Sequence, residues 1–478
     1  MRIVEPRIPL SSDRSTTQIA QWLQQLELAE IPHHVRQYAR TSLLDVLAVA
    51  WAAGHSEGVP ALQRVIQSSP IPTDGVHAHA PQPGHASLWG TALQAPAAEA
   101  AFHNSARAAA LDFDTVHETG GVHADIVIAP VVLAIGQSVG ASGAEVLTAH
   151  IAATEVLLRL GRATQTSSGW FRTSIYGVFG AAAAAARLLQ LTPEQTSNAL
   201  GIALSLAAGT QQASEEKTLT KRLQAAFAAQ AGISAARLAQ QGFTGPAHPF
   251  DGHFGLFALY DQADPSRAFH DLGETYLLPD TRFKLYPTCA CSHAAIQAAI
   301  ALYQQHALPL THIHSGEIVI TPYMNRMTGA PFVPQGNTEV LAQFNVRYAV
   351  ATALRFGVFS VHHLQPKAVL DPDTTALAQR LVITVLPDAL TRFAPATVHI
   401  RDAAGNTYSA HTTAQPGTID NPIAPAWLDA KADSAFGYGP DALSPAATQA
   451  LRQRIATLET SASIRALFSN LATLHPTP

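Results

Sequence analysis

The chain has 478 residues, of which 47% are hydrophobic and only 13% are charged. A chain of this length is too long for one simple core, so we expect two domains. The formal net charge of -5 argues against a nucleic-acid-binding protein, which would need a basic face.

The N-terminal segment bears on the cellular location of the protein, and the cysteines bear on its possible disulfide and metal chemistry. Residues 1–10 contain no long apolar run of the kind found in a secretory signal, and no apolar stretch reaches the roughly 20 residues that span a bilayer. The two cysteines, Cys289 and Cys291, are too few for a disulfide framework or an iron–sulfur cluster. No histidine pair flanks a glutamate at helical spacing, so no metal site is expected. We expect a cytoplasmic protein that contacts neither membrane nor nucleic acid.

Residues 16–271 are predicted to be helical almost throughout. Val35–Ala53 carries apolar side chains at helical spacing. Gly180–Leu191 is alanine-rich on nearly every side, which predicts a fully buried helix. Thr192 is predicted to begin the next helix, because Pro193 follows it and Gln195 can close a capping box.

A different pattern begins after Leu272, where strands alternate with helices. The predicted strands are Gly316–Pro322, Leu381–Leu386, Thr397–Arg401 and Thr407–His411. The last two flank an Asp-Ala-Ala-Gly-Asn turn and form a predicted hairpin. The helical segments between the strands are Ser292–His306 and Val340–Gly357.

The chain returns to helix at Ser444–Thr460, which is predicted to pack back on the first helices. The predicted fold class is therefore mainly α, with a large all-α domain that is discontinuous in sequence. This domain comprises residues 1–271 plus 415–478, and a smaller α+β lid domain of residues 272–414 is inserted into it.

Leu111–Asp125 concentrates ionisable side chains directly before the apolar run Ile126–Ile135. It contains four acidic residues and two histidines: Asp112, Asp114, Glu118, Asp125, His117 and His123. Ionisable groups at an apolar boundary acquire shifted pKa values, which suits acid/base chemistry. Asp112 is predicted to orient His123 as a general base. Asp114 and His117 are equally compatible with supporting the loop, and Asp125 with capping the following helix.

Short motifs occur in a fixed order across nearly the whole chain. They are Leu43–Leu47, Ala86–Gly90, Ala98–Asn104, Leu111–Asp114 with His123, Tyr176–Ala184, Thr220–Leu223, Gly242–Pro246, Phe283–Pro287 with His293, and Phe344–Tyr348. Together they resemble the MmgE/PrpD family, which includes 2-methylcitrate dehydratases, cis-aconitate decarboxylase and iminodisuccinate epimerase. The resemblance implies a helical domain with a smaller α+β lid, a homodimer, and an activity that needs no cofactor.

The resemblance also implies a set of site residues. The implied catalytic residues are Asp112, His123, Lys221, Lys284 and Tyr348. The residues expected to bind substrate around them are Arg172, Arg222, His117, Cys289 and His293. Lys221 precedes an alanine-rich helix, where an ammonium group can bind a carboxylate and stabilise enolate-like charge.

The chain departs from many relatives at positions where those relatives carry histidine. Phe171, Ala109, Gln224 and Cys289 stand at these positions. The replacements remove several acid/base groups of the dehydratase and the decarboxylase, and they favour the epimerase as an alternative.

The implied chemistry is removal of a proton from the carbon next to a carboxylate of a di- or tricarboxylic acid. His123 is the expected base, and Lys221, Lys284, Arg172 and Arg222 supply positive charge. Loss of a β-hydroxyl would make the protein a 2-methylcitrate-dehydratase-like hydro-lyase. Reprotonation on the opposite face, with Tyr348 as acid, would make it an epimerase of an iminodisuccinate-like diacid. The alternative from another class is a non-catalytic, carboxylate-binding homodimer.

Overall fold

The computed structural model describes residues 15–471, apart from residues 68–80, 167, 307–308, 336–337, 419–420 and 422. Segment 1–10, where we expect no secretory signal, lies outside the described residues. The structure is 56% helical and 10% strand, which confirms the predicted mainly helical class. Within the described ranges, no helix has both the length and the apolar character required to cross a bilayer.

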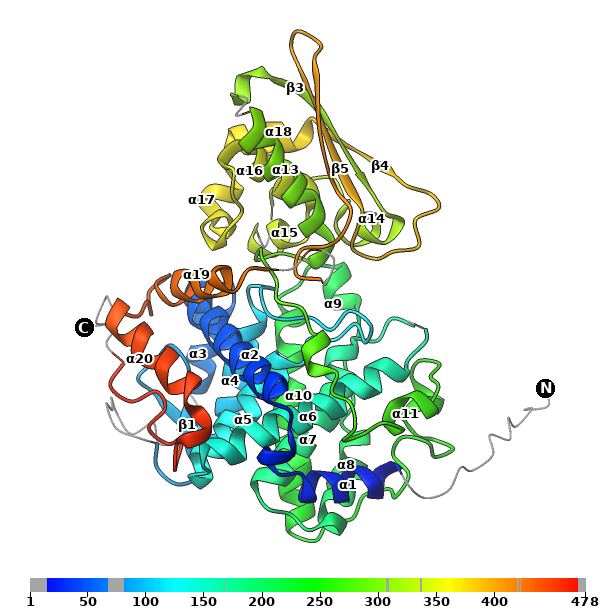
Figure 1. The fold of residues 1–478 in the computed structure, drawn as a ribbon, viewed down its shortest axis with the longest axis vertical. Helices are drawn as coiled ribbons and strands as arrows, with labels where there is room; N and C mark the ends of the chain where they lie inside the picture. Colours follow the sequence, from blue (N-terminus) through cyan, green and yellow to red (C-terminus); the bar gives the residue numbers. More distant parts are fainter. Residues whose placement is uncertain are drawn as a thin grey trace, which may run out of the picture.

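Most helices lie in what we call the helical part, residues 15–278 with α19 and α20 (Figure 1). Its helices are α1 (Ser15–Gln25), α2 (His33–Ala52), α3 (Val59–Gln67), α4 (Ala97–Ala109), α5 (Asp125–Val139), α6 (Gly143–Ala163), α7 (Arg172–Leu188), α8 (Pro193–Leu204), α9 (Gln212–Glu215), α10 (Thr220–Gln240), α11 (Leu256–Leu259), α12 (Ser266–Phe269), α19 (Pro425–Phe436) and α20 (Pro445–Ala456). It also contains an antiparallel pair of strands, β1 (His85–Ser87) and β2 (Gln94–Pro96). The prediction of an all-α part was wrong on this point, because three-residue strands are too short to show an alternating pattern.

The buried alanine-rich helix is α7, which packs against α5, α6, α8 and α10. Residues 181–186 are all fully buried alanines, as predicted, although the helix begins earlier, at Arg172. A side-chain carbon at Gly232 of α10 would lie 2.3 Å from Cβ of Ala181, so α10 and α7 can approach this closely only with glycine at this contact. The predicted start of α8 is confirmed: Thr192 and Gln195 form a capping box, and Pro193 is the first helical residue.

What we call the mixed part, residues 293–412, contains a four-stranded sheet of order β4-β3-β5-β6. Its strands are β3 (Ile313–Ile320), β4 (Leu381–Val385), β5 (Ala396–Asp402) and β6 (Thr407–Thr412), so the four predicted strands and the hairpin are confirmed. β3 is parallel to β4 and antiparallel to β5. The helices beside the sheet are α13 (His293–His306), α14 (Pro322–Thr328), α15 (Thr338–Gln343), α16 (Val346–Phe356), α17 (Pro366–Val369) and α18 (Pro372–Gln379).

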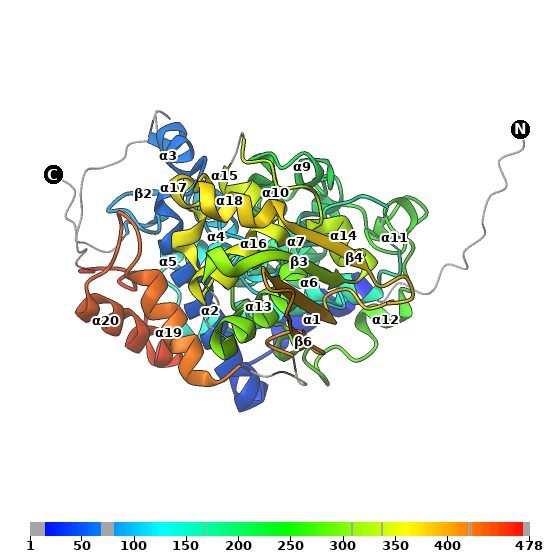
Figure 2. The same ribbon diagram turned by 90° about the horizontal axis from the view of Figure 1, so that it is seen from above.

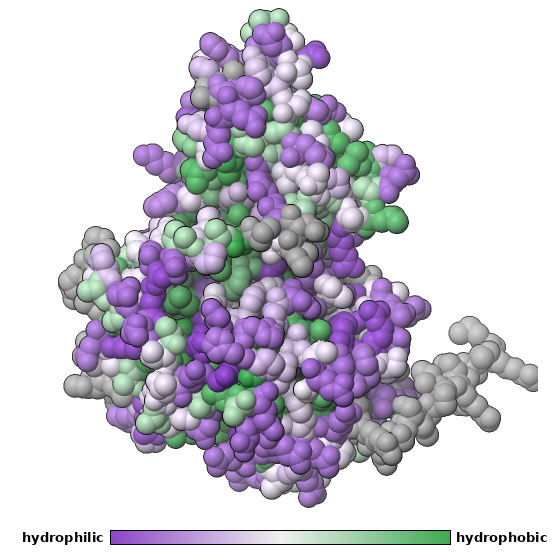
Figure 3. All heavy atoms as spheres, viewed as in Figure 1, coloured by the Kyte–Doolittle hydropathy of each residue, from purple (hydrophilic) through white to green (hydrophobic). Residues whose placement is uncertain are grey.

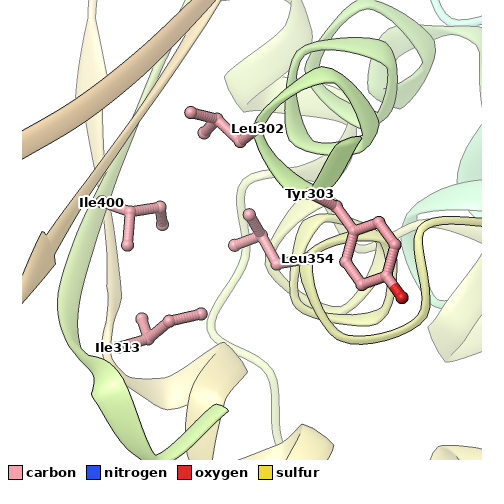
Figure 4. A pocket seen from close by; sticks show the side chains of 5 residues that line it. All are labelled: Leu302, Tyr303, Ile313, Leu354 and Ile400. Carbon is pink, nitrogen blue, oxygen red and sulfur yellow. The ribbon is translucent and has the colours of Figure 1, made fainter. Parts of the chain in front are cut away.

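An apolar layer joins the sheet to α13 and α16. Leu302 and Leu354 from the helices point towards Ile313 and Ile400 from the sheet (Figure 4). The gap between these side chains has a volume of only about 10 Å³. This volume is more than an order of magnitude smaller than that of a pocket for a drug-sized ligand. This space belongs to the core of the mixed part.

The predicted helix over Val340–Gly357 was wrong in one respect, because the structure divides it into α15 and α16. Asn345 lies at the break, with an extended backbone, and its side chain accepts a hydrogen bond from Tyr348 N at 3.1 Å. Its amide nitrogen also donates to the Ala330 carbonyl at 2.9 Å. An asparagine that caps a new helix competes with continuation of the old one.

The two parts are stacked along the long axis of the molecule, with α15 at the bottom of the mixed part (Figure 1). Seen from above, the sheet and its helices lie over the middle of the helical part, and α19 and α20 lie to one side (Figure 2). Hydrophilic residues cover most of the face shown in Figure 3, and hydrophobic ones gather near the narrowing between the two parts. α19 packs against α2. The domain boundaries and the role of a lid stay predictions.

Candidate active site

The loop between α4 and α5, residues 110–124, is held in place by backbone pairing with a distant segment. Val116 and Arg282 exchange two backbone hydrogen bonds of 2.9 and 2.8 Å. Within the loop, His117 pairs with Val122 across a tight turn in which Gly121 has a φ of +63°. This pairing carries Lys284, two residues after Arg282, to the start of the loop.

Asp112 lies at the centre of the candidate site and joins two lysines. Lys284 Nζ donates to Asp112 Oδ2 at 2.8 Å and to the Asp112 carbonyl at 2.7 Å. Lys221 Nζ donates to the other carboxylate oxygen. Asp112 has a φ of +49°, a left-handed conformation that aspartate tolerates better than most residues. The double contact with Lys284 stabilises this backbone geometry.

The two lysines differ in exposure. The side chain of Lys284 is 1% exposed, whereas that of Lys221, in the first turn of α10, is 16% exposed. Lys221 Nζ lies 4.8 Å from the centre of the Phe344 ring. Burial alone would raise the pKa of Asp112, but Lys221 and Lys284 hold it well below its usual range. Burial alone would lower the pKa of Lys284, but Asp112 and Asp114 raise it above the usual value. Lys284 is therefore an ammonium group at neutral pH, and the Asp112 carboxylate lies between it and Lys221.

His123 is paired with Asp114. Its Nδ1 lies 2.8 Å from Asp114 Oδ2, and its backbone N–H donates to Thr173 Oγ1 at 3.1 Å. The prediction that Asp112 orients His123 was therefore wrong, because the carboxylate that contacts the imidazole is that of Asp114. Burial raises the pKa of Asp114, but His123 and Lys284 outweigh this and lower it overall. Asp114 is thus ionised, and the His123 side chain, 20% exposed, has no other hydrogen-bond partner among the described residues.

A second buried ion pair, not anticipated from the sequence, supports the loop from behind. Lys431 of α19 pairs with Asp45 of α2 at 2.7 Å and donates to the Phe113 carbonyl at 2.9 Å. Its Nζ also lies 3.9 Å from the centre of the Phe113 ring. The sequence shows Asp45 as the one carboxylate within the apolar segment Leu43–Leu47, which is unusual for a buried helix. Nothing in the sequence indicates that Lys431 is its partner.

Asp125 does more than begin α5. Its carboxyl group accepts from Thr115 Oγ1 at 2.5 Å and from Ser42 Oγ at 3.4 Å, and lies 3.4 Å from His150 Nε2. Burial raises the pKa of Asp125 to about 7 and lowers that of His150 to about 3. Asp125 and His150 are therefore both uncharged in mildly acidic solution. Asp125 does not act only as a cap for the following helix, which was the alternative expected from the sequence.

Arg172 and Arg222, expected to bind substrate carboxylates, are already occupied. Arg172 Nε donates to Asp261 Oδ2 at 3.2 Å, and another nitrogen donates to the Thr166 carbonyl. Arg222 Nη2 donates to Glu339 Oε1 at 2.6 Å. Both arginines are buried. A carboxylate ligand would have to displace these internal acidic partners.

His117, Cys289 and His293 are buried, and their contacts are internal. His117 Nδ1 accepts from Gly120 N at 3.1 Å, and burial lowers the His117 pKa to about 4. Cys289 N donates to the Gln343 carbonyl at 2.9 Å, while a hydrogen bond with Cys291 lowers the pKa of the Cys289 thiol. His293 Nε2 lies 3.3 Å from the Thr288 carbonyl, and burial lowers the His293 pKa well below its usual value.

Tyr348 lies apart from the lysines. Its hydroxyl donates to the His363 carbonyl at 2.5 Å, and its ring stacks on Phe332 with 5.0 Å between centroids. It borders a pocket of about 300 Å³ that also includes His362 and Lys367. The described residues show no contact between Tyr348 and the Asp112 cluster.

The structure thus brings together Asp112, Lys221, Lys284 and a His123–Asp114 pair. A histidine oriented by a carboxylate can accept a proton, and adjacent ammonium groups stabilise negative charge that develops on a carboxylate-bearing carbon. Among the described residues, no group of three histidine, cysteine or acidic side chains could hold a metal ion. The arrangement defines a mainly helical protein with a buried carboxylate–lysine cluster beside a base.

Comparison with known families is consistent with this class. Residues 17–268 match the MmgE/PrpD N-terminal domain, and residues 286–459 match the MmgE/PrpD C-terminal domain. The chain therefore belongs to the MmgE/PrpD family.

Several known proteins are similar over most of the chain. The cis-aconitate decarboxylase-like protein oryM of Aspergillus oryzae is 27% identical over 382 residues, 75% of this chain and 77% of that protein. Cis-aconitate decarboxylase of Aspergillus terreus is 26% identical over 363 residues, 71% of each chain. The Homo sapiens protein of that name is 27% identical over 325 residues, 64% of this chain and 66% of its own. The family and these relatives support a lyase as the class of enzyme.

Proposed function

We propose that the protein is a cofactor-independent lyase that acts next to a carboxylate of a di- or tricarboxylic acid. The observation that carries this proposal is the pairing of His123 with Asp114 beside the Asp112–Lys221–Lys284 cluster. The cluster holds one more positive charge than negative charge when its three groups are ionised, so it favours an anionic ligand.

The reaction we favour is dehydration, as in a 2-methylcitrate-dehydratase-like hydro-lyase. His123 takes the proton from the carbon next to the carboxylate, and the electron pair of that C–H bond becomes the new carbon–carbon double bond. The bond to the β-hydroxyl breaks, and Lys221, the more exposed ammonium, gives the leaving oxygen a proton to form water. Lys284 stays charged beside the carboxylate that carries the developing enolate.

Decarboxylation is the second candidate, because the similar proteins named above are cis-aconitate decarboxylases or resemble them. The same lysines would stabilise the electron pair left on carbon when carbon dioxide departs, and protonated His123 would return a proton to that carbon. Epimerisation has less support, because Tyr348, its expected second acid, bonds to the His363 carbonyl instead.

A screen by proton NMR in deuterium oxide tests the proposal. Citrate-like and malate-like hydroxy acids, cis-aconitate-like unsaturated acids and iminodiacids are each incubated with the protein. A new vinyl signal from a hydroxy acid indicates dehydration, and carbon dioxide captured in a parallel assay indicates decarboxylation. Exchange of a C–H proton for deuterium with a change in optical rotation indicates epimerisation. Binding with neither turnover nor exchange would identify a non-catalytic carboxylate-binding protein and contradict the proposal.

The His123→Ala variant then tests the base. We expect kcat to fall by about 10²–10⁴-fold, the usual contribution of general acid–base catalysis. His314→Ala is the matched control, because His314 is exposed on β3 and should leave kcat unchanged. Unchanged turnover in His123→Ala would show that His123 is not the base.

The protein is also proposed to work as a homodimer, as the family resemblance implies. Sedimentation velocity at micromolar concentration measures this directly. A single species with the mass of one 50.5 kDa chain would contradict it.

A further inference from the structure

Two arginines share one aromatic ring close to the candidate site. Arg392 lies in segment 386–395, which joins β4 to β5, and its guanidinium carbon is 5.6 Å from the centre of the Tyr323 ring. The guanidinium carbon of Arg326, in α14, is 5.1 Å from the centre of the same ring. Stacking on an aromatic ring fixes a guanidinium group without using its hydrogen-bond donors.

Aromatic and ionic contacts place this group beside the loop that carries His123. Phe393 meets the Tyr323 ring edge-on, with centroids 5.7 Å apart, and the guanidinium carbon of Arg282 lies 5.8 Å from the Phe393 ring. Arg282 also pairs with Glu118 at 2.6 Å. A side-chain carbon at Gly121, two residues before His123, would lie 3.9 Å from Arg392 Nη1.

α14 also packs on the turn Ala290–Ser292, which directly follows Cys289. Burial, with the nearby thiols of Cys291 and Cys289, raises the pKa of Tyr323 to about 12. The Tyr323 hydroxyl therefore stays protonated at neutral pH and can donate a hydrogen bond to an anion. Tyr323 and Arg392 are thus held close to the loop from two directions.

Five other cations near the loop are already paired with acidic groups. Lys221 and Lys284 share Asp112, and Arg282 pairs with Glu118. Arg172 pairs with Asp261, and Arg222 with Glu339. Arg392 and Arg326 differ, because the described residues give neither of them an acidic partner. Of these two exposed arginines, Arg392 is the one that lies next to the loop, at Gly121.

We propose that Arg392, stacked on Tyr323, binds the substrate carboxylate that is remote from the reacting carbon. This inference rests on the proposed function, and it assigns to Arg392 the role that the sequence predicted for Arg172 and Arg222. The Asp112 cluster holds the carboxylate next to the reacting carbon, and Arg392 selects acids with a second carboxylate. Tyr323 is a positioning residue for the guanidinium group.

A binding cycle tests the proposal without requiring turnover. Calorimetric or NMR titration measures the affinity for succinate and for succinamate, in which one carboxylate is replaced by an amide. In the unsubstituted protein we expect succinate to bind about tenfold or more tightly than succinamate, because a charged hydrogen bond is lost with the amide. Arg392→Gln should remove this preference by weakening succinate alone.

Arg401→Gln is the matched control, because Arg401 is an exposed arginine on β5 of the same sheet. It should leave both affinities unchanged. Equal affinity for the two ligands in the unsubstituted protein, or a preference that survives Arg392→Gln, would overturn the inference. If the NMR screen finds no reaction but the succinate preference depends on Arg392, the proposed function fails and the carboxylate site stands.

Discussion

At the scale of single residues, the Asp-Phe-Asp sequence at 112–114 gives its two carboxylates different roles. Asp112 forms ion pairs with both lysines of the cluster, whereas the hydrogen-bond partner of the Asp114 carboxylate is the imidazole of His123. Phe113, between them, packs on Lys431. Two carboxylates two positions apart can therefore separate charge balance from orientation of the base.

The substitutions Asp114→Asn and Asp112→Asn should separate these roles. An amide at 114 no longer favours the productive orientation and tautomer of His123, so we expect kcat to fall by about 10²-fold or more with little change in KM. An amide at 112 leaves buried Lys284 without its closest counter-charge, so we expect the free energy of unfolding to fall by about 3–5 kcal/mol. Urea denaturation and steady-state kinetics measure both. Equal losses of kcat and of unfolding free energy in the two variants would contradict the separate roles of Asp112 and Asp114.

The two lysines should also differ in their effects on stability. Lys284→Met removes a fully buried partner of Asp112, and we expect a loss of about 3–5 kcal/mol, much of which Asp112→Asn in the same chain should restore. Lys221→Met should cost only about 1 kcal/mol, since that side chain is partly exposed, and should instead lower kcat. A double-mutant cycle in urea gives the coupling energy between Asp112 and Lys284. A coupling near zero would show that this ion pair does not stabilise the fold.

At the scale of secondary-structure elements, the loop between α4 and α5 is anchored by two neutralised groups. His117 accepts a hydrogen bond inside the turn at one end, and Asp125 collects hydroxyl donors at the other. Burial shifts their pKa values in opposite directions, His117 down to about 4 and Asp125 up to about 7. Both shifts favour the uncharged form.

These shifts give opposite dependences of stability on pH. His117 binds a proton only after unfolding between pH 6.5 and 4, so its contribution is present above that range and is lost as the pH falls through it. Asp125 releases a proton only on unfolding between about pH 4 and 7, so its contribution is present below that range and is lost as the pH rises. Asparagine at 117 offers an acceptor oxygen in place of the ring nitrogen of His117, and asparagine at 125 keeps one oxygen of the Asp125 carboxyl group. Neither asparagine titrates. Relative to His117→Asn, the free energy of unfolding of the unsubstituted protein should fall by about 3 kcal/mol from pH 7 to pH 4. Relative to Asp125→Asn, it should fall by about 4 kcal/mol from pH 4 to pH 7. Urea titrations at four pH values measure both differences, and slopes of the same sign would contradict the assignment.

The sequence predicted well those features that depend on neighbouring residues. The capping box at Thr192 and the hairpin of β5 and β6 were found because their signals lie within a few positions. The break at Asn345 was missed, since an asparagine inside an apolar periodic segment is compatible with both a continued helix and a new cap.

The site was predictable only in part, because its partners are distant in the chain. Asp112, His123, Lys221 and Lys284 could be nominated by their motifs, and the structure brings them together. The pairing of His123 with Asp114, and the occupation of Arg172 by Asp261, depend on contacts between remote segments. Arg392 gave no signal, because it lies in a segment between strands and outside every motif.

At the scale of the whole molecule, the site is assembled where the helical part meets the mixed part. Phe344 lies against Lys221, and the Gln343 side chain donates to the Ala110 carbonyl at 3.0 Å. The buried ion pair of Arg222 and Glu339 links α10 to α15. The position of Lys221, next to Arg222, therefore depends on how α15 is held.

Glu339→Gln should loosen this junction. Burial raises the pKa of Glu339 and Arg222 opposes the rise, so the carboxylate depends on this one guanidinium for its charge balance. The amide leaves Arg222 buried without a counter-charge, while the bond from Glu57 N to the side chain, 3.2 Å long, can be kept. We expect amide hydrogen exchange in residues 338–343 and at the start of α10 to accelerate by about tenfold or more, with a higher KM as Lys221 becomes less well placed. Glu194→Gln, at an exposed position on α8, is the control. Unchanged exchange in α15 would mean that the Arg222–Glu339 pair does not hold the two parts together, and the junction would then depend on the pairing of Val116 with Arg282 and on the apolar contact of Phe344.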